Sequence, residues 1–542
     1  MRCDRRRWIG IVAAAAVVGC SAVSEKWDRF LEGTEPDRAA PTVPPPPLGP
    51  DEAAPGPRVV VLSLPGLAAD DVERGMRDGL LPGFRHLRTR GTYARLVEGA
   101  TDAAAADAAL LTATDPAGVV APFARAPIDV PELGRSISVA RPVDAGGATV
   151  SAAGRIAAEG KRVEIVRAHC AFAPPGVRSL FGGAWPTLGT GTAPYTLAIE
   201  RDAPGDPVVS PGGVRVAVTS PTGDAEHDVF LIDVYGPPRL RDGFPSTARL
   251  RVTATKDRAR ASVIGDDDRV ELRAGRWSRP MALRFEIGEG APLRGRARLF
   301  LRPTGSGRLE LYVEPPDYDP TRPPPWQPLS SPPEFVRELA GRLEAVPRFS
   351  DPLPTAALRD GVLSAGDAAA RIEAAFEVER AMFERELLGG DFDLLFQSFG
   401  LAEQARRLIA GDDDAPVVFF GLRVPRHALD DAAASRLDSL VRAALLVADS
   451  GRLGPAVSVV VVGGTGPGAW FAIDRRGADL RSTSLADVGA LPSALLGVPL
   501  PHGVTGWVNA TGEPMEPLPE VQLRRTPKEE AELPSEFDLR GR

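Results

Sequence analysis

A histidine stands just after an apolar segment that has the pattern of a buried strand. The segment is Arg162–Arg167, and His169 follows it. In α/β proteins ligands bind beyond the carboxyl ends of the strands, so this imidazole is placed where a general base or a metal ligand would lie. A hydroxyl and several carboxylates could act with it, at Thr101, at Asp102 or Asp107, and at Glu403. With metal ions, such a set could support a hydrolytic reaction.

Two of these residues also have a structural interpretation. The segment Asp102–Leu111, DAAAADAALL, is a good helix former, and Thr101 or Asp102 stands where a helix cap is needed. Without a neighbouring base or metal the Thr101 hydroxyl would remain inert. We therefore expect these two residues to cap the helix.

Other clusters that could hold a metal lie in predicted turns. His227, within DAEHD, has three carboxylate neighbours, but it lies among short predicted strands, where we expect a solvated turn. Two GDDD segments, at Gly265 and Gly411, fall between apolar runs, where Asp and Gly serve as turn residues. Three further histidines are expected to be structural or solvent-exposed, namely His86, His427 and His502.

A loop of glycines follows the most strand-like segment of the chain. Val457–Val462 is too short for a helix and is β-branched at every position but Ser458, which predicts a central strand of a parallel sheet. The loop after it, Gly463–Gly466, reads GGTG and offers no strong metal ligand, acid or base. Its amides could cradle a phosphate, but no Lys follows and the spacing of a dinucleotide site is absent.

The elements that must position these residues indicate an α/β fold. Val59–Leu64 predicts a second buried strand, followed by a turn at Pro65 and by helices over Ala69–Gly79 and Leu80–Thr89. Strands and helices alternate in this way in doubly wound sheets. We expect a mostly parallel central sheet flanked by helices, with a first part over residues 58–205 and a second part over residues 316–511.

Between these two parts, residues 206–315 predict an inserted β-rich subdomain. Segments such as ARLRVTA and MALRFEI alternate apolar and polar residues and are separated by Gly, Asp and Pro, which is typical of antiparallel strands with one exposed face. Trp277 and Trp326 could be stacking residues of a carbohydrate- or protein-binding module, or structural anchors. The tail, residues 512–542, has no periodic pattern and is expected to be poorly ordered.

The N-terminal residues resemble a bacterial lipoprotein signal. Four arginines, an Ala- and Val-rich run and the sequence VVGC lead to Cys20. The resemblance implies cleavage of residues 1–19 and lipid attachment at Cys20, and the Pro-rich character of residues 20–57 predicts an extended tether. We expect the protein in the bacterial cell envelope, facing the periplasm or the exterior, with the membrane as a partner through the lipid.

Composition narrows the other partners. The formal net charge of −8 argues against nucleic acid. After loss of Cys3 and lipidation of Cys20, only Cys170 is a free thiol, so no intramolecular disulfide is possible and the apolar core must provide the stability.

Taken in order, several segments resemble the type I phosphodiesterase/nucleotide pyrophosphatase family of the alkaline phosphatase superfamily. They include RVVVLSLPGLAADDVERGMRDGLLPGF, GKRVEIVRAHCAFAPPGV, FDLLFQSFG, SVVVVGGTGPG and LADVGALPSALLGVPLPHGVTG, and the resemblance covers most of Arg58 to Asn509. It implies an alkaline phosphatase-like sandwich that hydrolyses phosphate esters with two metal ions, zinc or manganese, and a Ser or Thr nucleophile.

The positions that carry this chemistry in the family hold different residues here. The residues aligned with them are Pro65, Ala103, Glu403, Arg407, Gly464 and Thr465. Ala103 stands at the nucleophile and cannot attack phosphorus. Glu403 could still ligate a metal, whereas Arg407 brings a permanent positive charge to the place of a cation.

We therefore hypothesise a lipid-anchored pseudoenzyme. It would keep the phosphodiesterase frame without metals or catalysis, and would act in binding or scaffolding of an envelope component or a protein. The alternative is an active phosphodiester or phosphomonoester hydrolase with relocated ligands, which requires His169, Thr101, Glu403 and Asp102 or Asp107 to meet at the carboxyl edge of the sheet.

Overall fold

Eight strands form the central sheet of the molecule. The computed structural model describes residues 56–501 except 98, 115–122, 131–134, 143–150, 171–173, 182–194, 211–212, 221, 240–243, 289–290, 306, 325–328, 343–352, 410–415, 455 and 475–483. Several predictions lie outside the described residues: the lipidated Cys20, the tether, the tail, His502, Trp326 and the GDDD segment at Gly411.

The middle of this sheet is parallel. Its five parallel strands are, in spatial order, β24 (Val457–Gly463), β1 (Arg58–Leu64), β21 (Leu394–Ser398), β5 (Val163–Ala168) and β6 (Val177–Phe181). Antiparallel strands complete both sides. β25 (Trp470–Ile473) pairs with β24, and β2 (Thr92–Arg95) pairs with β25 at the edge; on the other side β20 (Ser330–Ser331) pairs with β6. The predicted α/β class and mostly parallel sheet are confirmed.

Side chains of β1 alternate between two apolar cores, one on each face of the sheet. Val60, Leu62 and Leu64 belong to one core, and Val59 and Val61 to the other. A strand buried on both faces needs apolar residues at nearly every position, which explains the run VVVLSL. Each fully buried Val or Leu contributes about 1.5–3 kcal/mol.

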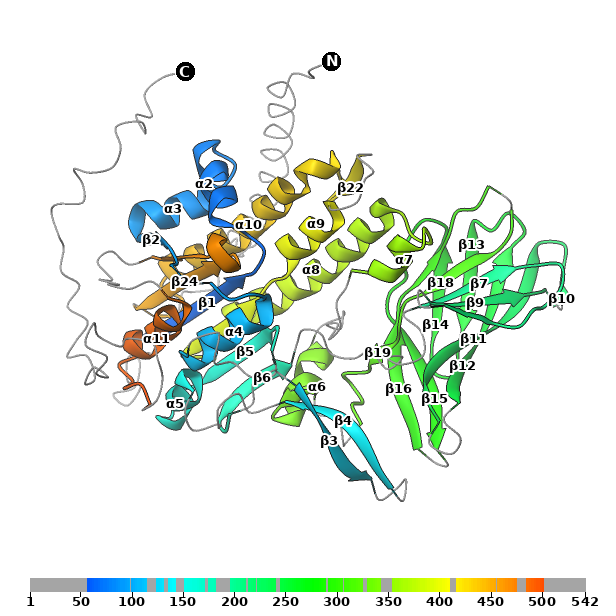
Figure 1. Cartoon of the computed structure of the whole chain (residues 1–542), viewed down its shortest axis with the longest axis horizontal. Coiled ribbons are helices and arrows are strands. Elements are labelled where there is room, and N and C mark those ends of the chain that lie inside the picture. Colours follow the sequence, from blue (N-terminus) through cyan, green and yellow to red (C-terminus); the bar gives the residue numbers. More distant parts are fainter. Residues whose placement is uncertain are drawn as a thin grey trace, which may run out of the picture.

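Helices cover both faces (Figure 1). The first core is covered by α2 (Ala69–Arg77), α3 (Pro82–Arg90), α6 (Pro333–Arg342), α8 (Ala365–Gly389), α9 (Leu401–Ile409) and α10 (Leu429–Asp449). The second core is covered by α4 (Ala103–Thr112), α5 (Ala152–Ala158) and α11 (Leu485–Leu495). Among the described residues, no helix is both long and apolar enough to span a membrane.

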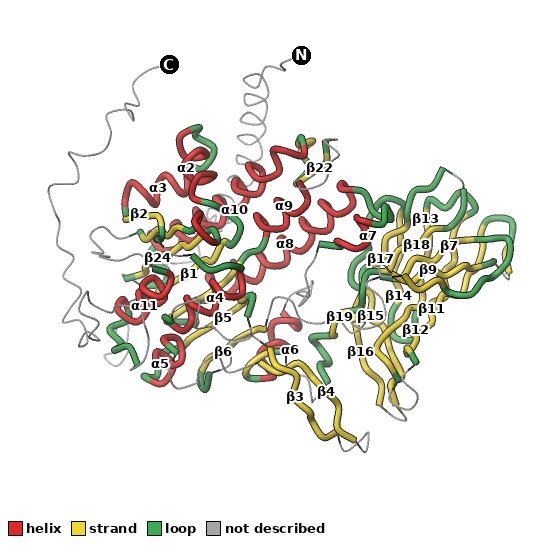
Figure 2. Tube along the Cα trace, viewed as in Figure 1, coloured by secondary structure: helices red, strands yellow, loops and turns green. Residues whose placement is uncertain are grey.

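A region of strands lies beside this layered core (Figure 2). One sheet contains β10 (Thr222–Gly223), β11 (His227–Pro238), β12 (Pro245–Thr255), β13 (Arg260–Ile264) and β14 (Arg269–Arg273). A second contains β15 (Met281–Gly288), β16 (Ala291–Ala297) and β19 (Asp317–Tyr318). A third contains β17 (Leu299–Leu301), β18 (Glu310–Val313), β7 (Thr196–Glu200), β9 (Gly213–Val218) and β8 (Val208–Ser210). The predicted separate antiparallel sheets are confirmed.

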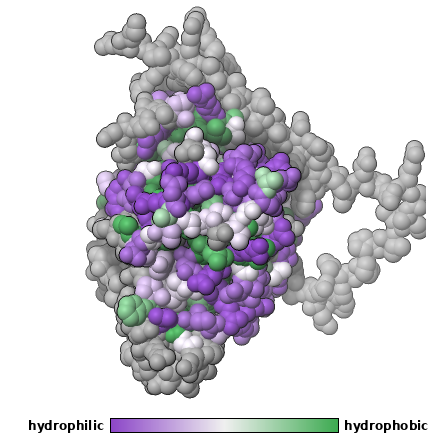
Figure 3. All heavy atoms as spheres, turned by 90° about the vertical axis from the view of Figure 1, so that its right-hand side faces the viewer, coloured by the Kyte–Doolittle hydropathy of each residue, from purple (hydrophilic) through white to green (hydrophobic). Residues whose placement is uncertain are grey.

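Alternation along these strands builds a core of their own. Every second residue of β12 from Ser246 to Ala254 is buried, and the residues between them are exposed or half-buried. Viewed from this end, the surface is mostly hydrophilic (Figure 3). Two features differ from the expectation: β7 precedes residue 206 yet belongs to these sheets, and β9 runs parallel to β7.

Short elements complete the described structure. Two hairpins are formed by β3 (Phe123–Val130) with β4 (Arg135–Pro142), and by β22 (Val417–Phe419) with β23 (Leu422–Val424). The helix α7 (Thr355–Arg359) precedes α8, and two 3-10 helices are η3 (Arg426–Ala428) and η4 (Gly466–Gly468).

Trp277 anchors the strand region to the layered core. Its Nε1 donates to the carbonyl of Asp367 in α8 over 2.8 Å, and its ring packs against Phe300 and Tyr312. The ring is therefore committed to a structural contact. These contacts support the interpretation of Trp277 as a structural anchor, and the hypothesis that it stacks on a ligand stays a prediction.

Two glutamates share a buried position between β5 and α8. Glu164 is 2% exposed and Glu386 is 8% exposed. Burial, followed by the neighbouring charge of Glu386, raises the pKa of Glu164 to about 8, while Arg178 opposes the shift. The folded protein consequently holds a proton here that the unfolded chain has already lost near neutral pH.

We predict that this proton makes the protein less stable as the pH rises from about 4.5 to about 8, because an acid whose folded pKa is raised binds protons preferentially in the folded state. Glu164→Gln should abolish most of that loss, which we place on the order of 2 kcal/mol. Urea unfolding across this pH range measures it. Glu338→Gln, in a half-exposed glutamate that also pairs with Arg178, is the control and should follow wild type. Parallel curves for wild type and Glu164→Gln would contradict the prediction.

Candidate functional site

The loops at the carboxyl edge of the central sheet contact one another. The amide of Gly464, after β24, donates to the carbonyl of Leu64 in β1 over 3.3 Å. The amide of Gly466 donates to Ala100, before α4, over 2.8 Å. The amide of Phe399, after β21, donates to Ser63 over 2.9 Å. Segments from four parts of the sequence therefore meet where the fold class places a ligand site.

Glycines let these loops approach closely. Gly66 has a φ of +82°, and a Cβ there would lie 2.5 Å from the amide nitrogen of Glu403. Gly464 has a φ of +75°, and a Cβ there would lie 2.2 Å from the carbonyl oxygen of Gly468. A side chain at either position would collide with backbone. The edge between β1, β21 and β24 is closed by main chain.

The positions aligned with the family's catalytic residues lie around this edge. Pro65 is buried in the turn after β1, and Ala103 is the buried first residue of α4. Gly464 and Thr465 follow β24, and Glu403 is half-buried in the first turn of α9. Arg407 is one turn further along α9, where it is exposed and donates to Thr355 in α7 over 3.0 Å.

A buried carboxylate and a histidine form the polar centre of the edge. Asp107 in α4 is fully buried, and its Oδ2 accepts hydrogen bonds from the His169 amide at 2.7 Å and from His169 Nδ1 at 3.0 Å. Its Oδ1 accepts from the Ser63 hydroxyl at 2.6 Å. Of the two carboxylates that the sequence offered as partners for His169, the structure selects Asp107.

Ser398 completes this group but is not arranged as a nucleophile. Its Oγ lies 2.8 Å from His169 Nδ1, the same nitrogen that contacts Asp107, and the residue has no exposed surface. A Ser-His-Asp triad needs the hydroxyl at Nε2 and the carboxylate at Nδ1. The four side chains therefore form a buried polar network rather than a triad.

The other ring nitrogen of His169 faces the start of α9. A Cβ on Gly400 would lie 3.2 Å from Nε2, a tight contact that places the glycine directly beside the ring. The side chain is 14% exposed. Burial lowers the pKa of His169, but the hydrogen bond and charge of Asp107 more than offset this, so the pKa lies above its ordinary value.

Thr101 and Asp102 do not join this network. Asp102 is the N-cap of α4, with its Oδ1 accepting from the amide of Ala105 at 2.8 Å. The Thr101 hydroxyl lies 3.4 Å from Asp102 Oδ2, and both residues are exposed. The capping interpretation is confirmed for Asp102.

No metal-binding group is formed in the part of the chain that the structure describes. Nowhere among those residues do three or more His, Cys, Asp or Glu side chains lie together in a way that could hold a metal ion. Glu403, Asp102, Asp107 and His169 are all described, so they do not constitute a ligand set. These residues do not fit the two-metal centre that the family resemblance implies.

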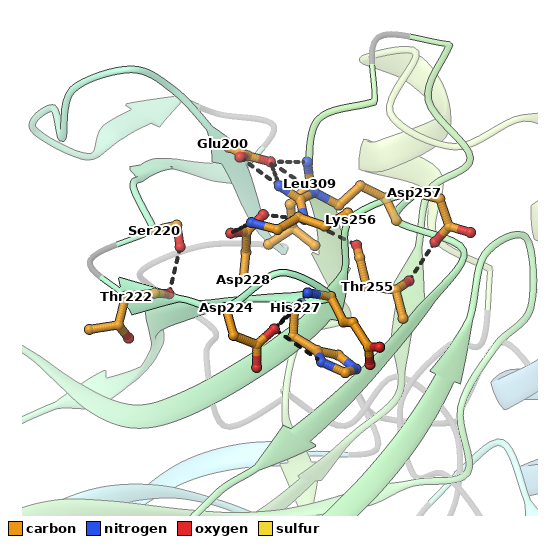
Figure 4. A network of polar contacts seen from close by, with 12 residues as sticks. Glu200, Ser220, Thr222, Asp224, His227, Asp228, Thr255, Lys256, Asp257 and Leu309 are labelled. Carbon is orange, nitrogen blue, oxygen red and sulfur yellow. Dashed lines mark hydrogen bonds and ion pairs between the residues drawn. The ribbon is translucent and has the colours of Figure 1, made fainter.

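His227 is the half-buried first residue of β11, directly after an exposed turn, so the expectation that it lies in a solvated turn is wrong by one element boundary (Figure 4). Asp224 Oδ1 accepts from the amides of Glu226 and His227 at 2.7 and 2.6 Å, which fixes the turn before β11. Asp228 is engaged by Lys256 at 2.5 Å and by Arg258 at 2.8 Å. The carboxylates beside His227 serve the turn and the neighbouring cations.

The remaining candidates also have structural surroundings. His86 is exposed on α3 next to Arg90, and His427 lies in η3. In the GDDD segment at Gly265, Asp268 pairs with Arg279 at 2.7 Å and Asp267 with Arg294 at 2.6 Å. Asp267 and Asp268 therefore link the turn between β13 and β14 to Arg294 in β16 and to Arg279.

Sequence reasoning missed Ser63 and Ser398. Both are polar residues near the end of predicted buried strands, VVVLSL and FDLLFQSF, and the structure pairs them in register. A serine at the same distance from the end of two adjacent strands was the available signal, because buried hydroxyls require partners.

Comparison with known proteins identifies no relative. No protein-family model matches the chain. No curated protein matches it either.

We predict that Asp107→Asn lowers the pKa of His169, because the negative charge that favours the imidazolium is lost. NMR titration of the imidazole protons measures this, with His169→Gln assigning the signal. Wild-type stability should decline as the pH rises through the folded pKa of His169, since the raised pKa stabilises the folded protein only while the ring is protonated. Destabilisation by Asp107→Asn should be on the order of 2 kcal/mol.

Asp102→Asn is the matched control, since it changes an exposed carboxylate on the same helix and Asn caps as well as Asp. It should leave both the His169 titration and the stability nearly unchanged. An unaltered His169 pKa in Asp107→Asn would show that the network does not control the imidazole.

Proposed function

We propose that this chain is a lipid-anchored pseudoenzyme with an alkaline phosphatase-like fold, resembling the type I phosphodiesterase/nucleotide pyrophosphatase family. The fold supports this through a parallel strand order of β24-β1-β21-β5-β6, helices on both faces and a β-rich region between β6 and α6. The role of the protein is binding or scaffolding of an envelope component or a protein partner, in the cell envelope.

One observation carries the proposal. The edge where the family would assemble its catalytic centre is present, but its residues are a proline, an alanine and glycines whose loops close on each other. Gly66 touches the backbone of Glu403, and Gly464 touches the backbone of Gly468. Restoring an Asp at position 464 would collide with main chain, so the loss of the ligand is built into the local packing.

The charge at this edge also opposes two bound cations. Two-metal hydrolysis needs several carboxylates and imidazoles to offset the ion charges. Of the aligned positions, only Glu403 carries an acidic side chain. Asp107 and His169 satisfy each other, which leaves Glu403 without a second ligand among the described residues.

One observation favours the alternative, an active hydrolase with relocated groups. His169 has a raised pKa, an oriented Nδ1 and an Nε2 that faces the start of α9. An Asp–His pair of this kind can act in acid–base catalysis. It lacks an adjacent nucleophile, because Ser398 contacts the wrong nitrogen and Thr101 belongs to the cap of α4.

We predict no stoichiometric zinc or manganese in the purified full-length protein, and no hydrolysis of bis(p-nitrophenyl) phosphate above background. Elemental analysis and an absorbance assay with and without added metal measure this. His169→Gln is the control: any residual rate should be the same in this variant. Stoichiometric metal with turnover that a chelator abolishes would overturn the proposal, and a rate that depends on His169 alone would establish the alternative.

For the lipid anchor, we predict that Cys20→Ser moves the protein from the membrane fraction to the soluble fraction, because no acceptor for the lipid remains. Cys170→Ser is the control, since this thiol is buried and its loss should not change fractionation. Membrane retention of Cys20→Ser would contradict lipidation at this residue.

A further inference from the structure

A charged cavity lies between α8 and the strand region. The centres of water-sized molecules can occupy about 30 Å³ of it. α8 contributes an apolar wall that includes Ala374, Ala375 and Val378. Four arginines line it from three parts of the fold: Arg167 in β5, Arg371 in α8, and Arg296 and Arg298 from β16 and the residue after it.

Three carboxylates line the same cavity, namely Glu314, Asp317 and Glu379. A fourth carboxylate, Asp319, pairs with Arg296 over 2.9 Å. Arg167 Nη1 pairs with Glu379, and Arg371 Nε donates to Glu314 over 2.9 Å. The other oxygen of Glu314 accepts the amide of Arg298 at 2.9 Å. Both carboxylate oxygens of Glu314 therefore accept hydrogen bonds, and Arg371 donates to Glu314 through its Nε.

Arg167 lacks a partner for part of its guanidinium. The residue is 5% exposed, and its Nε is buried with no hydrogen-bond partner among the described residues. Arg371 is 3% exposed and makes the single hydrogen bond to Glu314. A buried guanidinium presents five donors and no acceptor, and an unsatisfied buried donor is costly.

Arg258 shows what a satisfied buried arginine looks like in this protein. It is 7% exposed, and its nitrogens are engaged by Glu200, Asp228 and the carbonyl of Thr255. Arg167 differs from Arg258, because its buried Nε has no hydrogen-bond partner among the described residues, and this residue lines the cavity.

We infer that this cavity binds a small oxyanion, a phosphate or a short-chain carboxylate, between Arg167 and Arg371. Oxyanions match the planar donor fork of a guanidinium and can accept two parallel hydrogen bonds. The apolar side chains of α8 that line the cavity offer no further donors. This site goes beyond the proposed function, since it does not depend on whether the sheet edge is degenerate.

Isothermal titration of the full-length protein with sodium phosphate and with sodium acetate, against sodium chloride at equal ionic strength, tests the inference. We expect saturable binding of phosphate or acetate, a matching rise in melting temperature, and no effect of chloride. The anion that binds more tightly, phosphate or acetate, identifies the class of ligand. Absence of saturable binding by both would overturn the inference and would leave the proposed pseudoenzyme unaffected.

Variants locate the binding. Ala374→Leu fills the cavity from a half-buried helical position without removing a charge, and Arg371→Lys keeps the charge but removes the fork. Each should weaken binding at least about tenfold. Arg258→Lys makes the same change at an arginine whose nitrogens already have partners, so this variant should bind phosphate and acetate as wild type does. If Arg371→Lys does not fold, Ala374→Leu decides, and unchanged affinity in Ala374→Leu would place the anion elsewhere and refute the site.

Discussion

The carboxylate of Asp107 organises the core of this molecule. It is fully buried, and it accepts hydrogen bonds from Ser63 in β1 and from both the amide and the ring of His169 after β5. Through His169 the same network reaches Ser398 in β21. A buried carboxylate is tolerated only when its oxygens are satisfied, so α4 is held in one position against three strands. The arrangement of the carboxyl edge follows from that position.

Close backbone contact at this edge replaces side-chain chemistry. Gly66 and Gly464 have positive φ values and leave no space for a Cβ, and Gly400 packs closely beside the ring of His169. In other α/β proteins the loops at this edge can present ligand-binding side chains. In this protein the loops pack on one another. The acid–base pair of Asp107 and His169 therefore stands behind a closed edge, and its main observable role is to join α4 to the sheet.

The strand region is held to the layered core by polar contacts along α8. Trp277 donates to the carbonyl of Asp367 near the start of that helix, and Arg371 pairs with Glu314 one turn further along. Arg167 and Glu379 form a second buried pair beside the same helix. Buried pairs of this kind contribute orientation more than stability, because desolvation offsets most of their attraction. An apolar cluster also joins the two parts, with Phe300 and Tyr312 of the strand region packed with Val362 and Leu363 before α8.

Local pattern and composition determined much of this protein. Apolar runs such as VVVLSL and SVVVV specified strands buried on both faces, and the Ala-rich segment with Asp102 before it specified a capped helix. The mostly parallel sheet and the separate β-rich region followed from the same periodicities. Which groups meet was decided only by tertiary structure. Asp107 lies 62 residues from His169 and 44 from Ser63, and Ser398 lies 229 residues from His169, so no local signal joins them. The pairing of β7 with β9, the hydrogen bond of Trp277 to α8 and the charged cavity likewise depend on contacts between distant parts of the sequence, which form only when the chain folds.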